Sequence, residues 1–68
     1  MIVIDGDKLK SLRISQGLTQ QTLAYESGTS VKTISCIENG RLHGGTRTLN
    51  KLAKRLCVDT EELLKKVV

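Results

Sequence analysis

The chain has 68 residues, a net charge of +4, two cysteines and one tyrosine as its only aromatic residue. This length allows one small domain, expected to span residues 1–68, and the aliphatic composition favours a helical fold over a β-sandwich. Two cysteines are too few for a disulfide scaffold and are not spaced as zinc ligands, and no leader or long apolar run is recognisable. We therefore expect a cytoplasmic protein with free thiols, no membrane segment, no metal and no cofactor.

Local signals delimit three helices in the first half of the chain. Hydroxyl and carboxylate side chains can cap a helix start, and glycine adopts the left-handed conformation that often ends one. The expected ranges are 6–15, 20–27 and 31–39. The expected caps are Asp5 or Asp7, Thr19 and Ser30, and the expected stops are Gly17, Gly28 and Asn39-Gly40. Helical spacing turns these apolar residues inward: Leu9, Leu12, Leu23, Ala24, Ile34 and Ile37.

Two further helices are predicted after a loop at residues 41–45. The fourth covers about 46–56 and turns Leu49, Leu52, Ala53 and Leu56 inward. Asp59 and Glu62 have the spacing of a capping box for the fifth, which would present Leu63 and Leu64 and end near Lys65 and Lys66. The leading segment Ile2-Val3-Ile4 can form a short strand or cover the core beside the fifth helix.

Basic residues are concentrated in the middle of the chain. Residues 8–55 contain nine Lys/Arg and two Asp/Glu, a net charge of +7, whereas the two ends together have a net charge of −3. This distribution indicates a polyanion that contacts one region of the surface, although scattered solvated lysines would give the same count.

Residues 20–39 have the features of two short helices joined by a glycine turn. Ala24 is small where the helices would cross, and Gly28 can supply the positive φ of the turn. In such a helix-turn-helix the second helix can enter the DNA major groove. The segment GLTQQTLAYESGTSVKTISCIENGR, residues 17–41, resembles the Cro/phage-repressor type (Xre-like) family of helix-turn-helix DNA-binding proteins, and TLNKLAKRLCVDTEELL, residues 48–64, resembles that family's last two helices. The resemblance implies an all-α, compact five-helix, lambda-repressor-like domain with its helix-turn-helix at the second and third helices.

The resemblance also implies roles for the residues that match the family pattern. The DNA base-facing positions are Ser30, Val31, Lys32, Ser35 and Cys36. The phosphate-contacting positions are Gln20, Thr33, Asn39, Arg41 and Arg47. Arg13 and Glu38 would form a structural ion pair between the first and third helices. Asn39 can serve equally as the C-cap of the third helix, and Lys32 can donate to guanine or to a phosphate.

Two departures from the family pattern shape the expectations. Val31 and Cys36 occupy positions where several relatives have amide side chains, and they can offer only apolar contact, most usefully to a thymine methyl group. We therefore predict modest base specificity with at least one thymine per half-site, and an exposed Cys36. Cys57 occupies a position where relatives commonly have glycine, so it is either strained in a left-handed conformation, in a relaxed turn, or buried as a small hydrophobe.

These observations predict a sequence-specific double-stranded DNA-binding transcriptional repressor. It would place helix 31–39 in the major groove and act as a homodimer on a palindromic operator. No Ser/His/Asp or Cys/His set, phosphate-binding glycine loop or apolar carboxylate pair suggests an enzyme. The alternative is a protein-interaction module, such as an antitoxin that neutralises a partner and regulates its own synthesis, with a toxin or co-regulator as the partner protein.

Overall fold

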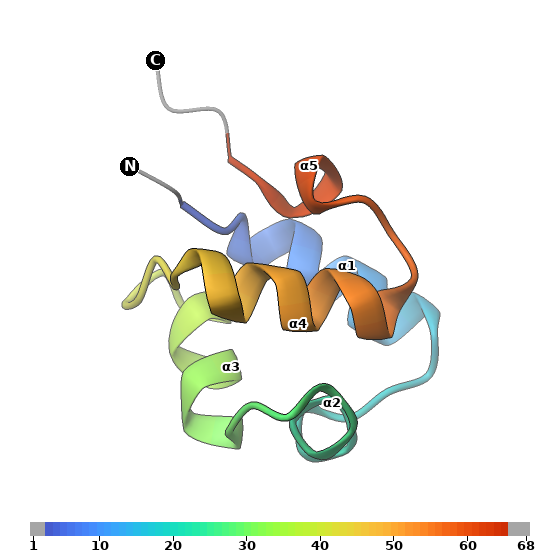
Figure 1. Ribbon diagram of the computed structural model, residues 1–68. Helices are drawn as coiled ribbons and strands as arrows, with labels where there is room; N and C mark the ends of the chain where they lie inside the picture. Colours follow the sequence, from blue (N-terminus) through green and yellow to red (C-terminus); the bar gives the residue numbers. More distant parts are fainter. Residues whose placement is uncertain (1–2, 66–68) are drawn as a thin grey trace.

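The computed structural model describes residues 3–65. Figure 1 shows the helices of the molecule and the connections between them. They are α1 (Gly6–Ser15), α2 (Gln20–Ser27), α3 (Val31–Glu38), α4 (Thr46–Leu56) and α5 (Thr60–Leu63). The predicted all-α, five-helix architecture is confirmed, and α1 to α4 begin and end within one residue of the predicted bounds.

The predicted caps explain why the first three helices begin where they do. The side chains of Asp5, Thr19 and Ser30 each accept a hydrogen bond from a backbone N–H in the first turn of the following helix, at 3.0 to 3.2 Å. Gly28 ends α2 in the left-handed region with φ of 76°. An L-residue rarely adopts this conformation, so the tight turn between α2 and α3 depends on glycine.

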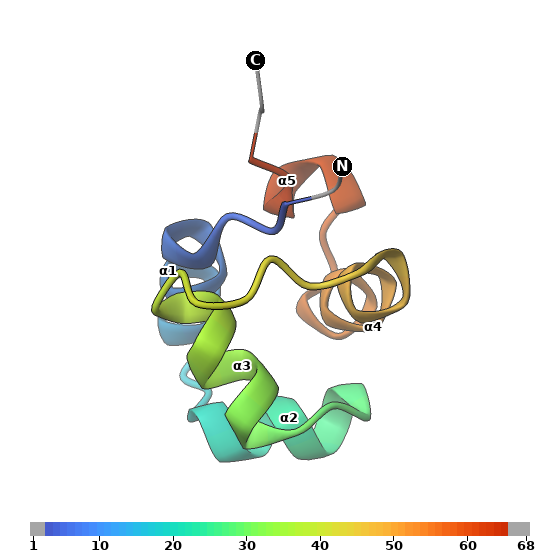
Figure 2. The same cartoon turned by 90° about the vertical axis from the view of Figure 1, so that its left-hand side faces the viewer.

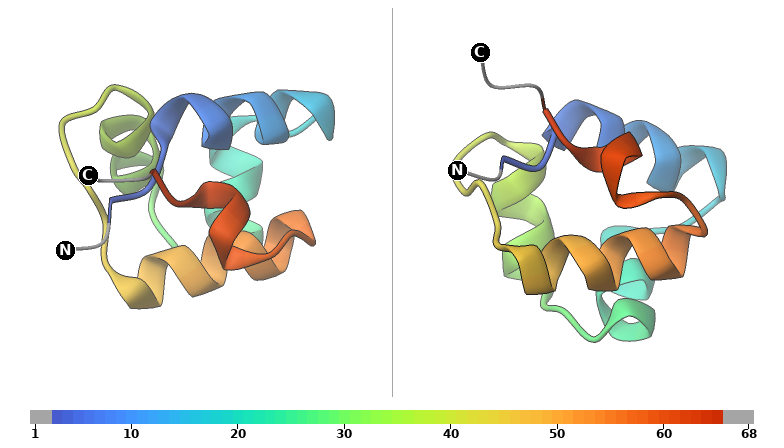
Figure 3. Two further views of the ribbon diagram at one scale, coloured as in Figure 1. Left: turned by 90° about the horizontal axis from the view of Figure 1, so that it is seen from above. Right: turned by 45° about the horizontal axis from the view of Figure 1, so that its top comes forward.

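The α2–α3 pair and α4 pack against one another at one end of the molecule. Figure 2 looks onto α3, which crosses in front of α2, while α4 is seen almost end-on beside it. The described ends of the chain lie beside each other next to α5, away from α2 (Figures 1 and 3). Among residues 3–65, no other helix covers the outer side of α3 in these views.

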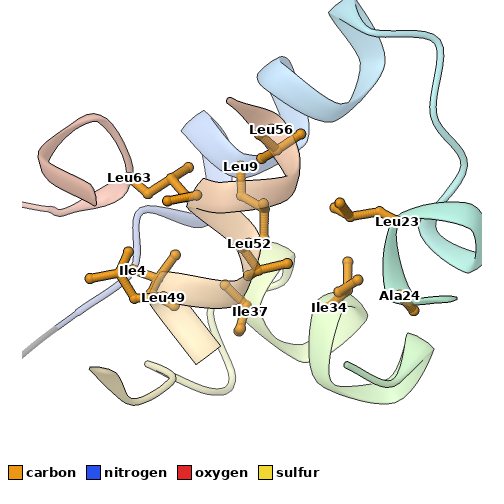
Figure 4. Close-up of a cluster of buried hydrophobic side chains, with 11 residues drawn as sticks. Ile4, Leu9, Leu23, Ala24, Ile34, Ile37, Leu49, Leu52, Leu56 and Leu63 are labelled. Carbon is orange, nitrogen blue, oxygen red and sulfur yellow. The ribbon is translucent and has the colours of Figure 1, made fainter. Parts of the chain in front are cut away.

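A single aliphatic core joins all five helices. Figure 4 shows side chains from every helix converging on the space between α1, α3 and α4. Burial of this apolar surface is the main term that stabilises so small a chain. Leu12, which was predicted to point inward, and Leu64, which the fifth helix was predicted to present, are half-buried at the rim. The buried core residues are Ile4, Leu9, Leu23, Ala24, Ile34, Ile37, Leu49, Leu52, Ala53, Leu56 and Leu63.

The predicted capping box of the fifth helix is wrong. Asp59 precedes the first residue of α5, but its side chain makes no capping hydrogen bond. The helix stops at Leu63, because the chain then becomes extended and Leu64 pairs in an antiparallel bridge with Ile4. Lys65 therefore lies in an extended segment and not in the last turn of the helix, while Lys66 lies outside the described residues.

The N-terminal segment covers the core, as one of its two predicted roles required, and in place of the predicted short strand it forms a single bridge. Ile4 forms the bridge with Leu64 and is also 3% exposed in the core. The backbone N–H of Asp5 donates to the Leu63 carbonyl at 2.7 Å, and that of Lys65 donates to the Val3 carbonyl at 2.9 Å. These two bonds join the ends of the described chain. Ile2, the first residue of the predicted segment, lies outside the described residues.

Cys57 adopts the left-handed conformation, with φ of 58° and ψ of 41°, directly after α4. It is the one non-glycine residue with positive φ among residues 3–65, and its thiol is exposed. Of the three alternatives for Cys57, the strained one is therefore correct, and the relaxed turn and the buried thiol are not.

Candidate nucleic-acid interface

The helix α3 has one buried face and one uncovered face. Ile34 and Ile37 are at most 1% exposed and attach the helix to the core, whereas Val31 is 42% exposed. Lys32 is also exposed, next to Val31 at the N-terminal end of the helix. A short helix that is anchored on one side and open on the other can approach a DNA groove without rearrangement of the core.

Four of the five predicted base-facing residues lie together on α3. Val31 and Lys32 are exposed, and Ser35 and Cys36 follow one turn later and are half-buried. The fifth, Ser30, is exposed, but its hydroxyl caps α3 and donates to the hydroxyl of Thr33 at 2.8 Å.

The expected exposure of Cys36 is wrong, because the residue is half-buried. The backbone N–H groups of Arg41 and Leu42 both donate to the Cys36 carbonyl, at 2.8 and 3.3 Å. These two bonds bring the loop after α3 against the last turn of the helix. Cys36 offers a smaller apolar surface than Val31.

Three of the five predicted phosphate-contacting residues lie at separate helix ends. Gln20 is the first residue of α2, Asn39 is the C-cap of α3, and Arg47 is the second residue of α4. Asn39 and Arg47 are exposed, as is Arg41 in the loop between α3 and α4, whereas Gln20 is half-buried. The fifth residue of the set, Thr33, is half-buried, and its backbone N–H is bound to the Ser30 hydroxyl.

Asn39 has the C-cap position that was considered as an alternative role. Its backbone N–H donates to the Ser35 carbonyl at 3.0 Å, and its side-chain amide lies 3.4 Å from the Ser35 hydroxyl. The second contact is long for a hydrogen bond, so the amide remains available to another acceptor.

The ion pair between Arg13 and Glu38 is bidentate and largely shielded from water. Arg13 Nε donates to Glu38 Oε2 at 2.8 Å, and Nη2 donates to Oε1 at 3.1 Å. The two side chains are 11% and 3% exposed, and the third guanidinium nitrogen donates to the Leu18 carbonyl at 2.8 Å. The pair therefore ties α1 to the last turn of α3, as the family resemblance implies.

The charge on the Arg13 guanidinium is stable. The hydrogen bond to Glu38, together with the carboxylate charge, raises the pKa of Arg13 above its ordinary value, against the opposing effect of burial. A group whose pKa is raised by folding contributes its full stabilisation below the unfolded-state pKa. The guanidinium therefore stays charged, and its contribution is retained, throughout the neutral pH range.

Sequence reasoning did not predict that Gln20 joins this ion pair. Its amide Nε2 donates to Glu38 Oε1 at 3.1 Å, which links the start of α2 to the end of α3. A carboxylate can only accept, so the NH₂ group must face Glu38, and one of its two N–H donors remains for another acceptor. The backbone N–H groups at the start of α2 are also suited to an anion.

The charges around the uncovered face of α3 are positive. Lys32, Arg41 and Arg47 are exposed, and Glu38, the acidic residue of α3, is neutralised by Arg13. The acidic residues at the ends of the sequence lie instead at the start of α1 and around α5. Such a distribution favours the phosphate backbone of a nucleic acid at the α3 side.

Within residues 3–65, no helix is long and apolar enough to cross a membrane, and no group of three or more His, Cys, Asp or Glu side chains could hold a metal ion.

The five-helix arrangement, with α2 and α3 joined by a left-handed glycine and α3 uncovered, defines a helix-turn-helix protein of the lambda-repressor-like fold. Residues 6–65 match the family model described as "Helix-turn-helix domain", and the chain belongs to this family, whose solved relatives include regulators of the Cro/phage-repressor type. No match to this chain was found among curated protein sequences.

Solved structures support this assignment. The restriction-modification controller protein C.AhdI from Aeromonas hydrophila is 33% identical, with a TM-score of 0.81 over 84% of this chain and 86% of that chain. SinR, described as the master regulator for biofilm formation and solved in complex with DNA, shares the fold at 24% identity, with a TM-score of 0.80 over 85% of this chain and 94% of that chain. A structure of the SinR–SinI protein complex gives a TM-score of 0.84 at 25% identity over 93% of this chain and 62% of that chain.

Proposed function

We propose that this protein is a transcriptional repressor that binds double-stranded DNA in a sequence-specific manner through α3. The observation that carries the proposal is the uncovered face of α3, which is held to the core by Ile34 and Ile37 and surrounded by exposed cations. Membership of the helix-turn-helix family and the similarity to C.AhdI, a restriction-modification controller, support the same role.

Base recognition would come from the N-terminal half of α3. Lys32 can donate to O6 or N7 of guanine, and Val31 can contact the methyl group of thymine. Cys36 would add a smaller apolar contact, because it is half-buried. Ser30 would contribute through its position at the helix start, since its hydroxyl is used in capping, and Ser35 can reach a base edge from the next turn. The expected recognition therefore uses few direct contacts, and DNA shape would supply part of the specificity.

Phosphate contacts would fix the position of α3 in the groove. The start of α2 with Gln20, the end of α3 with Asn39, and the exposed side chains of Arg41 and Arg47 surround the uncovered face. Thr33 would assist from the first turn of α3. With about four phosphates neutralised per subunit, a dimer would neutralise about eight, and the logarithm of the association constant would fall with the logarithm of salt concentration at a slope of about −7.

A homodimer on a palindromic operator would double these contacts. An α3 of eight residues can read only a few base pairs, and helix-turn-helix proteins commonly place two subunits on half-sites about 34 Å apart. The paired segments around Ile4 and Leu64, next to α5, lie away from α2 and are a suitable region for contact between subunits. Sedimentation of the protein with and without operator DNA measures this stoichiometry.

Binding-site selection from random DNA tests the proposal. Wild-type protein should select a near-palindromic site with at least one thymine under α3. Lys32→Ala should lose preference at one base pair if Lys32 reads a base, or weaken all sites uniformly if it contacts a phosphate. Lys10→Ala, at an exposed lysine of α1 without an ion-pair partner among residues 3–65, is the matched control and should select the wild-type site. Selection of no site, or a salt slope near zero, would exclude the proposal.

A second candidate function is protein interaction, as in a module that neutralises a partner and regulates its own synthesis. The similarity to a structure of the SinR–SinI complex favours it, because a related regulator there is bound to another protein. This function is compatible with DNA binding. Protein interaction would be the main function if the wild-type chain bound a co-purified partner protein at micromolar concentrations and bound no DNA at low salt.

A further inference from the structure

A second positively charged surface lies beside the helix-turn-helix. An open groove of about 560 Å³ separates the C-terminal end of α2 from the C-terminal half of α4. Three of the six lining side chains are cationic and one is acidic, and none is a large apolar residue. The lining residues are Glu26, Ser27, Lys51, Lys54, Arg55 and Cys57.

The cations of this groove continue a stripe along the outer face of α4. At 100° per residue, Arg47, Lys51 and Lys54 lie within about 60° of one another, on the side opposite the buried Leu52 and Leu56. All three side chains are exposed. The stripe from Arg47 to Lys54 advances seven residues along the helix, so it is about 10 Å long. The stripe begins at the start of α4, where the loop from α3 arrives, so it is continuous with the cations around the uncovered face of α3.

One hydrogen bond places the groove next to the DNA-binding end of α3. Lys51 Nζ donates to the Gly28 carbonyl at 3.3 Å, and Gly28 lies two residues before Ser30, the N-cap of α3. In helix-turn-helix proteins the N-terminal residues of this helix contact the bases. An ammonium group has three N–H donors, so Lys51 keeps two for another acceptor.

The remaining charges leave the groove positive. The carboxylate of Glu26 accepts from Arg55 Nη2 at 2.6 Å, so the acidic residue of the lining is already neutralised. Lys54 has no ion-pair partner among residues 3–65. The groove therefore presents two ammonium groups, those of Lys51 and Lys54, to an anion from outside.

We propose that Lys51 and Lys54 extend the DNA interface along α4 and bind the sugar-phosphate backbone beside the site read by α3. This inference rests on the DNA-binding function proposed above. An acidic protein segment is the alternative occupant, but protein docking sites draw their affinity from buried apolar or aromatic anchors, and no large apolar or aromatic side chain lines this groove. A DNA backbone requires only spaced cations, because each strand presents one phosphate per 3.4 Å along the helix axis.

The salt dependence of operator binding tests this surface. Lys54→Gln removes a charge and no ion pair, whereas Lys51→Gln also removes the bond to Gly28, so Lys54 is the cleaner position. If the dimer loses two phosphate contacts, the magnitude of the log–log salt slope should fall by about 1.8. Lys54→Gln should select the same bases as wild type and should have the same melting temperature. Lys10→Gln, at an exposed lysine of α1 without an ion-pair partner among residues 3–65, is the matched control and should leave the slope unchanged.

The outcomes separate this inference from the function on which it depends. If wild type binds its operator with a steep salt dependence and Lys54→Gln has the same slope, the α4 surface is wrong and the proposed function stands. If wild type shows no salt-dependent DNA binding, the proposed function itself fails. If Lys54→Gln binds operator normally but loses affinity for poly-glutamate, the groove serves an acidic protein segment and the inference is overturned.

Discussion

Replacing Cys57 with glycine tests whether the end of α4 is strained. The left-handed conformation of Cys57, with φ of 58° and ψ of 41°, costs an L-residue about 1–2 kcal/mol and is easily adopted by glycine. Glycine also makes the unfolded chain more flexible, which offsets about 0.4–1 kcal/mol of the gain. The exposed thiol lies 3.9 Å from the Arg55 carbonyl oxygen, so its loss removes little. We expect Cys57→Gly to raise the free energy of unfolding by about 0.5–1 kcal/mol.

Thermal unfolding followed by circular dichroism, under reducing conditions and at fixed protein concentration, measures this effect. A chain of 68 residues has an unfolding entropy of about 0.14 kcal/mol/K, so the melting temperature should rise by about 4–7 °C. Cys57→Ser is the matched control, because it removes the sulfur but keeps the Cβ atom that causes the strain. If Cys57→Gly melts no higher than Cys57→Ser, the argument from backbone strain is refuted.

Two further predictions concern the packing of α3. Glu38→Gln should lower the free energy of unfolding by about 2 kcal/mol in urea denaturation, because it leaves the shielded Arg13 guanidinium without a counter-charge. Glu62→Gln is its control, because Glu62 and Lys8 form an exposed ion pair whose side chains are 53% and 46% accessible. This change should lower the free energy of unfolding by less than about 1 kcal/mol. Equal losses of stability in the two variants would contradict the reasoning. Gly6→Ala should destabilise by at least about 1–3 kcal/mol, because the added Cβ would lie 2.2 Å from the Ile37 carbonyl oxygen at the contact of α1 with α3. Gly45→Ala is the control, because its Cβ would lie in open space and Gly45 has a negative φ. If Gly45→Ala lowers the free energy of unfolding as much as Gly6→Ala does, crowding at Ile37 is not the cause of the destabilisation.

Much of the fold was predictable because its signals act over a few residues. Thr19 and Ser30 cap α2 and α3 through hydrogen bonds that span three residues, and Gly28 ends α2 through its own backbone conformation. The spacing of Ile34 and Ile37 is likewise a property of a single helix. The family pattern across residues 17–41 then related these elements to DNA binding.

The candidate site was predictable in its outline and less so in its contacts. Val31 and Lys32 lie on the uncovered face of α3, where the periodicity of the helix puts them. The spacing of Arg47, Lys51 and Lys54 was equally visible in the sequence, but the groove that they share with α2 depends on how α2 and α4 pack. No local pattern indicates that Gln20 donates to Glu38, because 18 residues separate them.

The amino-acid sequence by itself determined where α1 to α4 begin and end, which side of each faces the core, and which family the chain resembles. Only the tertiary structure decided the features that depend on distant partners. The helix α5 ends after four residues because Leu64 pairs with Ile4 across the fold, and Cys36 is half-buried although its position on α3 predicted exposure. Capping and periodicity are local, whereas strand pairing, burial and the Lys51–Gly28 contact require segments that meet only after the chain has folded.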